Sequence, residues 1–179
     1  MTFPQQYKNQ VLQAIETIEL DKVGQAIELF REGTKYDPKN VDLYLGLEEA
    51  MEKAGRPARE RARALQGFPE LQSAPAVLVF RLVRVLSDAG EFDDAEKLLA
   101  NRFFPREEGG ASVREIYVAL RLKRAESIAA QGQCPAALDI VRHLGEPVVT
   151  LPFTSKGLGP LISSASSKQA VKKIEATCH

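Results

Sequence analysis

The 179-residue sequence contains no tryptophan, only two histidines and only two cysteines. Two cysteines cannot build the disulfide framework of a small secreted domain, so we expect reduced thiols and a cytoplasmic location. His143 and His179 offer little material for a metal centre or for acid–base catalysis. The scarcity of these residue types argues against metalloenzymes and disulfide-rich folds, and we predict no catalytic residue, no metal and no cofactor.

The sequence also lacks an excess of charge and a long apolar run. Lys+Arg and Asp+Glu each number 24, and this zero net charge argues against non-specific nucleic-acid binding. No stretch approaches the roughly 20 apolar residues of a membrane span. The first ten residues, MTFPQQYKNQ, lack the basic and apolar regions of a signal peptide, so none is expected. We therefore expect neither nucleic acid nor a membrane as a partner.

Helix-forming residues fill most of positions 5–145, where alternating β-branched residues are nearly absent, so the sequence predicts an all-α fold. Asn40 is a suitable N-cap for a helix that starts at Val41. Helices are predicted at about 5–20, 23–34, 41–54, 58–66, 75–89, 95–101, 112–131 and 135–144. Two shorter helices are predicted in the tail, at about 155–163 and 168–177. This pattern suggests a repeat array over 1–145 and a helical cap over 146–179.

A spaced pattern recurs along the predicted array. A small residue is followed four positions later by a large apolar one at Ala26/Phe30, Ala95/Leu99 and Ala137/Val141. In two of these places a glycine lies five residues before the alanine, at Gly90 and Gly132. The interval from Ala26 to Ala95 is 69 residues, about twice a unit of 34 residues. The spacing therefore indicates helical hairpins that repeat and stack on one another.

This pattern resembles the tetratricopeptide repeat (TPR) over about residues 7–145. The residues that carry the resemblance are Ala26, Phe30, Pro38, Tyr44, Leu47, Gly90, Phe92, Ala95, Gly132 and Ala137. Glu48 departs from the pattern, because a small residue is usual there. The resemblance implies a right-handed α–α superhelix of about four hairpins with a C-terminal cap. It also implies a non-enzymatic interaction module or scaffold that binds a peptide or a domain in a concave groove.

In TPR arrays the first helix of each hairpin lines the groove. By this resemblance, the tentative partner-binding residues are Phe80, Arg84, Asp88, Leu122 and Glu126. Two interpretations of the first two stay open: Phe80 and Arg84 hold an apolar and an acidic group of a peptide, or Phe80 is a core residue and Arg84 is merely exposed.

Other functions remain as alternatives. The chain is alternatively an oligomerisation region, forming a homo-oligomer, or an intramolecular scaffold within a larger multidomain, even enzymatic, protein. Cys134 lies near a predicted helix N-terminus, where a thiol can become reactive, but a small buried structural residue is the favoured interpretation. His143 is expected to cap a helix end, and Cys178-His179 lacks further ligands for a metal.

Overall fold

The computed structural model describes residues 20–100, 102, 104, 113–147, 149–151, 154–158 and 160–179. The chain divides into two compact units, residues 1–85 and 86–179. The division falls inside the helix Ala76–Asp88, and the last turn of this helix belongs to the second unit. The tail shares the second unit with the helices before it, and the predicted division at residue 145 stays a prediction.

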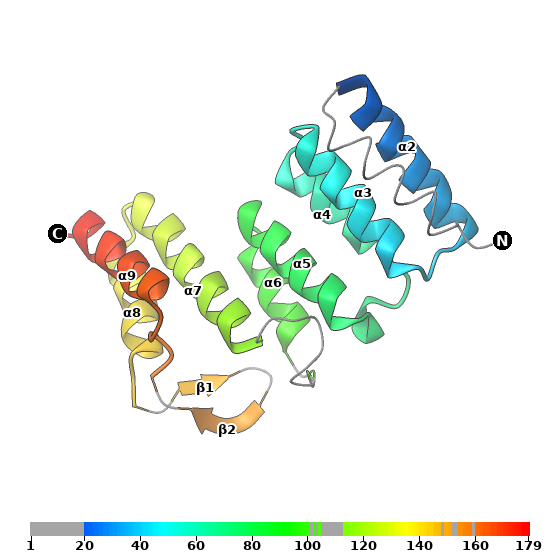
Figure 1. The fold of residues 1–179 in the computed structure, drawn as a ribbon. Coiled ribbons are helices and arrows are strands. Elements are labelled where there is room, and N and C mark those ends of the chain that lie inside the picture. Colours follow the sequence, from blue (N-terminus) through cyan, green and yellow to red (C-terminus); the bar gives the residue numbers. More distant parts are fainter. Residues whose placement is uncertain are drawn as a thin grey trace. The chain divides into compact units, whose positions relative to one another are not determined.

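Helices build the first unit (Figure 1). Its elements are α2 (Leu20–Tyr36), α3 (Val41–Lys53), α4 (Ala58–Gln66), the 3₁₀ turn η1 (Leu71–Ser73) and α5 (Ala76–Asp88). The predicted N-cap is confirmed, because the Asn40 side chain accepts a hydrogen bond from the Asp42 backbone N–H at 3.1 Å. The predicted helix at 5–20 lies almost entirely outside the described residues.

Helices also dominate the second unit, and a short two-stranded β-hairpin lies between its last two helices in the chain. Its elements are α6 (Phe92–Leu99), α7 (Val113–Ala130), α8 (Cys134–Leu144), β1 (Val149–Leu151), β2 (Thr154–Leu158) and α9 (Ala165–Thr177). β1 and β2 pair antiparallel, with Val149 opposite Leu158 and Leu151 opposite Thr154. The predicted helix at 155–163 is therefore wrong, whereas the predicted helix at 168–177 is confirmed as part of α9.

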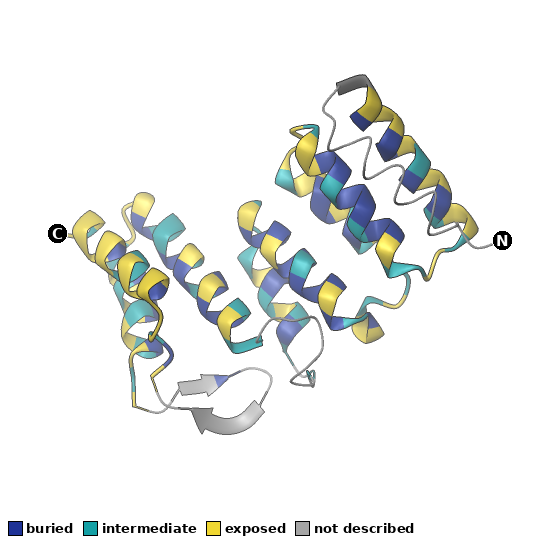
Figure 2. Cartoon of the chain, viewed as in Figure 1, coloured by how far each residue is buried: buried dark blue, intermediate teal, exposed yellow. Residues whose placement is uncertain are grey.

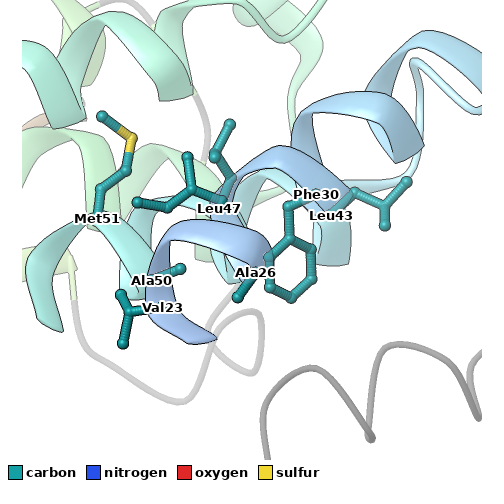
Figure 3. Packing of buried hydrophobic residues seen from close by; sticks show 8 residues of the cluster. Val23, Ala26, Phe30, Leu43, Leu47, Ala50 and Met51 are labelled. Carbon is teal, nitrogen blue, oxygen red and sulfur yellow. The ribbon is translucent and has the colours of Figure 1, made fainter. Parts of the chain in front are cut away.

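One core cluster of the first unit lies between α2 and α3 (Figure 3). Phe30 is fully buried and packs against the place where α3 carries Gly46. A Cβ atom added at Gly46 would lie 2.5 Å from Phe30 Cζ, so only glycine allows this approach of the two helices. The cluster consists of Val23, Ala26, Ile27, Phe30, Leu43, Leu47, Ala50 and Met51. The small Ala26 and large Phe30 are both in this core, as the repeat pattern predicts.

Tyr44, in the first turns of α3, holds this helix to the turn that precedes it. Tyr44 donates a hydrogen bond from its hydroxyl to the Pro38 carbonyl oxygen at 3.0 Å. The Tyr44 ring also meets the Phe68 ring edge to face, with centroids 5.2 Å apart and an interplanar angle of 76°. The tyrosine thus ties the turn before α3 to the segment after α4.

The contacts of the Glu48 side chain explain why a glutamate replaces the small residue that is usual at this repeat position. Its side chain is fully buried, and its two carboxylate oxygens accept hydrogen bonds from Arg61 of α4 and Arg81 of α5, each at 3.0 Å. Arg61 also lies 2.7 Å from Glu52 Oε1. A buried carboxylate is tolerated when cations and hydrogen bonds compensate for its lost hydration. This cluster joins α3, α4 and α5 of the first unit.

Three helices end in the same glycine turn. Gly55, Gly90 and Gly132 follow α3, α5 and α7, with φ of 71°, 76° and 81°. In each turn the residue after the glycine donates its backbone N–H to the carbonyl five residues earlier: Arg56 to Met51, Glu91 to Leu86, and Gln133 to Ile128. This pattern is the Schellman motif, which needs the left-handed conformation that glycine adopts most readily. The three glycines therefore end their helices in equivalent turns.

Candidate functional site: the groove along α7

Helix α7 lies at the centre of the second unit, where it contacts α6, α8 and α9 (Figure 1). Contacts with three neighbours explain why apolar residues occur around much of its surface. Its buried residues are Tyr117, Val118, Leu120, Leu122, Ala125 and Ala129. Exposed residues alternate with these buried ones along α7 (Figure 2). One face of the helix therefore remains open beside α9.

A hollow of about 760 Å³ lies between that face and the start of α9; we call it the α7–α9 groove. From α7 it is lined by Arg114, Glu115, Val118, Ala119, Leu122, Lys123 and Glu126, and from the α9 side by Leu161, Ser163, Ser164, Ser166, Ser167 and Ala170. Val118 and Leu122 are almost completely buried, whereas Ala119 is exposed. The groove thus has an apolar floor and a rim of charged and hydroxyl-bearing side chains.

A second hollow of about 380 Å³ adjoins the groove, because both are lined by Lys123 and Glu126. Its other lining residues are Ser87, Asp88, Gly90, Phe92, Ser127, Ala130, Lys173, Ile174 and Thr177. The two hollows together follow α7 from Arg114 to Ala130. At about 1.5 Å per residue, this face of the helix is about 24 Å long.

Ion pairs balance the charge in the middle of this face. Lys123 Nζ pairs with Asp88 Oδ1, and Lys173 Nζ lies 3.6 Å from Glu126 Oε2. The side chains of Lys123 and Lys173 are 47% and 72% exposed, so water screens both pairs. Near the end of the groove, Arg114 donates a hydrogen bond to the Pro160 carbonyl oxygen at 3.1 Å. The face therefore presents both signs of charge, with no large excess of either among the described residues.

The α9 wall begins at a well-defined helix start. Ser164 is the N-cap, and its hydroxyl accepts a hydrogen bond from the Ser167 backbone N–H at 3.1 Å. The Ser167 hydroxyl in turn donates to the Ser164 carbonyl oxygen at 2.9 Å. These bonds satisfy backbone groups that a helix terminus leaves free. The serines therefore fix where α9 starts and place hydroxyl groups along the groove.

The far end of α9 is joined covalently to α8. Cys178, the C-cap residue of α9, forms a disulfide with Cys134, the first residue of α8, and their Cα atoms are 5.4 Å apart. This bond contradicts the expectation of reduced thiols. It also changes the assessment of Cys134, since a sulfur in a disulfide has no thiol available as a nucleophile. The cytoplasmic location rested on that expectation and stays a prediction.

The structure brings three of the five tentative partner-binding residues to this face. Leu122 lines the α7–α9 groove, Asp88 lines the second hollow, and Glu126 lines both. Phe80 and Arg84 belong to the first unit. Phe80 is only 6% exposed and lies in the core, while Arg84 Nη2 lies 3.9 Å from Glu52 Oε1. Burial thus favours the interpretation of Phe80 as a core residue.

Sequence reasoning missed the residues that α9 contributes to the site. Ser164, Ser167, Lys173 and Ile174 all lie in the tail, where no repeat motif pointed to a groove. A local signal did exist, because Ser164 followed by Ser167 has the spacing of an N-cap serine and its N3 residue. What the sequence could not show is that α9 packs on α7, since this contact joins distant parts of the chain.

Neither a metal cluster nor a membrane span is found among the described residues. Over these parts of the chain, no group of three or more His, Cys, Asp or Glu side chains is placed to hold a metal ion. Nor does any described helix combine the length and apolar content needed to cross a membrane. His143 Nδ1 lies 3.1 Å from Glu146 Oε2, just beyond the end of α8. The groove along α7 is therefore the candidate binding site of the chain.

Comparisons with family models, with curated proteins and with solved structures find no match for this chain. The TPR relationship therefore stays a resemblance of motif and spacing.

Proposed function

We propose that the chain is a non-enzymatic interaction module that binds an extended peptide segment of a partner protein along α7. The observation that carries this proposal is the pair of adjoining hollows, about 760 and 380 Å³, that share Lys123 and Glu126. A face about 24 Å long accommodates about seven residues of extended chain at about 3.3 Å per residue. This length suits a peptide better than a compact small molecule.

The lining chemistry also suits a peptide. The floor at Val118 and Leu122 receives an apolar side chain, while serine hydroxyls on the α9 wall offer hydrogen bonds to a peptide backbone. Lys123 and Glu126 lie where the hollows join, so the groove can pair with either sign of charge on the ligand. By the TPR resemblance, α7 is the first helix of the fourth hairpin, and such helices line the ligand groove in that family.

A matched pair of variants, each replacing an exposed alanine by arginine, tests this proposal. Ala119 is exposed in the groove, and Ala136 is exposed on α8 and lines neither hollow. Arginine is a good helix former, so Ala119→Arg fills the groove while leaving the helix intact. Peptides would first be selected on the unmodified protein from a phage-displayed library of random peptides of about twelve residues.

The selected peptides should bind Ala119→Arg at least about tenfold more weakly than the parent, as measured by fluorescence polarisation. Ala136→Arg should bind them with the parent affinity. Peptides that bind both variants equally would place the site elsewhere. Failure of the selection to enrich any sequence above an uncoated surface would count against peptide docking itself.

A further inference from the structure

We propose that the Cys134–Cys178 disulfide is a redox latch that holds α9 in place as a wall of the groove. Reduction of the bond releases the C-terminal end of α9 and weakens binding along α7. The bond joins residues 44 positions apart and ties the end of α9 to the beginning of α8. Its effect on α9 follows from the structure alone, whereas its effect on binding rests on the proposed function.

Few side chains of α9 are fully buried, although the helix packs along α7 and also contacts α8. Of its 13 residues, only Ser167 and Ile174 are buried. Among the described residues, the ion pair between α9 and α7 is Lys173–Glu126, which water screens. A 13-residue helix is marginal by itself in water, so its stability depends on packing against the rest of the fold. The disulfide therefore adds a covalent tie to the packing that keeps α9 docked.

The position of the bond connects it to the groove. Cys178 directly follows Thr177, which lines the second hollow together with Lys173 and Ile174. The other end of α9 lines the α7–α9 groove through Ser164 and Ser167. Loosening α9 from its C-terminal end therefore removes wall residues from the second hollow first. Fraying that continues toward Ser164 then opens the groove as well.

The chemistry requires a reductant that can reach the bond. Cys134 and Cys178 are each partly exposed, so a dithiol reductant can attack one of the two sulfurs. The attacking thiolate forms a mixed disulfide and releases the other cysteine as a thiolate, which takes up a proton. The second thiol of the reductant then displaces the remaining cysteine. The protein gains two electrons and two protons, and the reductant leaves as a disulfide.

Hydrogen–deuterium exchange of the full chain tests the latch. Amides of α9, residues 165–177, should exchange about tenfold faster or more after treatment with dithiothreitol. Amides of α3, residues 41–53 in the first unit, should keep their rate and serve as the control. The variants Cys134→Ser and Cys178→Ser should each show fast exchange in α9 without any reductant, which separates loss of the bond from other effects of dithiothreitol.

Two results would overturn the latch. Alkylation by iodoacetamide of both cysteines in protein kept under oxidising conditions would show that the bond does not form. Equal exchange of α9 before and after reduction would show that the bond forms but does not hold the helix.

A binding measurement tests the link to the groove. A peptide selected on the oxidised protein should bind the reduced protein about tenfold more weakly. Unchanged affinity combined with faster exchange in α9 would overturn the link while leaving the latch in place. Failure to select any peptide on the oxidised protein would count against the proposed function, and the exchange rates would still decide whether the latch exists.

Discussion

Arg81 donates a hydrogen bond to Glu48 at 3.0 Å, which connects α5 to a carboxylate that is fully buried in α3. Arg61 holds the other oxygen of the same carboxylate from α4. The side chain of Arg61 is 8% exposed and that of Arg81 is 30% exposed, so both cations have lost much of their hydration. Glu48 is therefore the shared anion on which both arginines depend.

Replacement of Glu48 by alanine should lower the free energy of unfolding by about 3–5 kcal/mol, because it removes the buried carboxylate that Arg61 and Arg81 both contact. Urea denaturation of the full chain measures this change. Glu28→Ala is the matched control, since Glu28 pairs with Arg31 on the surface and its side chain is 71% exposed. This control should stay within about 0.5 kcal/mol of the parent. Equal effects of the two substitutions would show that the Glu48 cluster contributes no more than a surface ion pair.

The pH dependence of stability should also carry the signature of Glu48. Burial raises the pKa of its carboxyl above the ordinary value of 4.5, although Arg81 and Arg61 act in the opposite direction. The folded protein therefore holds this proton more tightly than the unfolded chain does. The associated stability is fully present below pH 4.5 and is lost as the pH rises through the folded pKa.

Glu48→Gln removes this titration. The free energy of unfolding of the parent minus that of the variant should therefore fall as the pH rises from 4 toward 7. Urea unfolding of both proteins at several pH values gives this difference. Because both proteins share the other titrating groups, the effects of those groups cancel. If the free energy of unfolding of the parent instead rises relative to that of the variant as the pH increases, the arginines outweigh burial and lower the pKa of Glu48.

Gly46→Ala should destabilise the first unit by about 1–3 kcal/mol, because the added methyl group overlaps the Phe30 ring. Gly24→Ala is the matched control within α2, since nothing lies within 4 Å of its added Cβ atom. That change should raise stability by up to about 1 kcal/mol through helix propensity. Thermal unfolding followed by circular dichroism compares the two variants.

The overlap at Gly46 can also be relieved from the other side. Phe30→Leu shortens the side chain that the new methyl group meets, so the double variant should recover part of the loss caused by Gly46→Ala alone. Strictly additive effects of the two substitutions would show that the glycine does not act through Phe30.

Tyr44→Phe should cost about 1 kcal/mol, because it removes the hydrogen bond to the Pro38 carbonyl while keeping the ring against Phe68. Tyr36→Phe is the control, since Tyr36 is 62% exposed at the end of α2. Urea unfolding should place this control close to the parent. If Tyr36→Phe lowers the free energy of unfolding as much as Tyr44→Phe does, the hydrogen bond from Tyr44 to Pro38 makes no specific contribution to stability.

The local parts of the fold could be predicted from the sequence, because capping and turn residues act over a few positions. Asn40 marked the start of α3, and Gly90 marked the end of α5, since each satisfies a backbone requirement at its own place. Glu48 could not be assigned in this way. Its partners lie 13 and 33 residues further along the chain, and only the fold brings them together.

The tail was predicted less well than the hairpins. Leu158, Leu161 and Ile162 lie at helical spacing, yet β2 spans Thr154–Leu158 and pairs with β1. Short strands of three and five residues are too brief to display a clear alternation, so the partner strand decides the structure. The disulfide was missed for a related reason, because the approach of Cys134 and Cys178 depends on where α9 docks.

A few of the residues that line the hollows along α7 are ones that the TPR resemblance implies for a groove, and their role in binding stays a prediction. Leu122 and Glu126 were placed on the groove by their positions on the first helix of a hairpin, and α7 carries both at the hollows. The opposite wall comes from α9, which no motif connects with α7. A helical period identifies a face of a helix, but it does not identify what lies across from that face.

The glycine turns at Gly90 and Gly132 have a consequence for engineering the chain. Each is followed by an N-cap residue of nearly the same conformation, Glu91 at φ −89°, ψ 60° and Gln133 at φ −90°, ψ 56°. We therefore expect that the tripeptides 89–91 and 131–133 can be exchanged without altering the ends of α5 and α7 or the starts of α6 and α8. The shape of this turn therefore resides in the backbone at each glycine rather than in the side chains of the helices beside it.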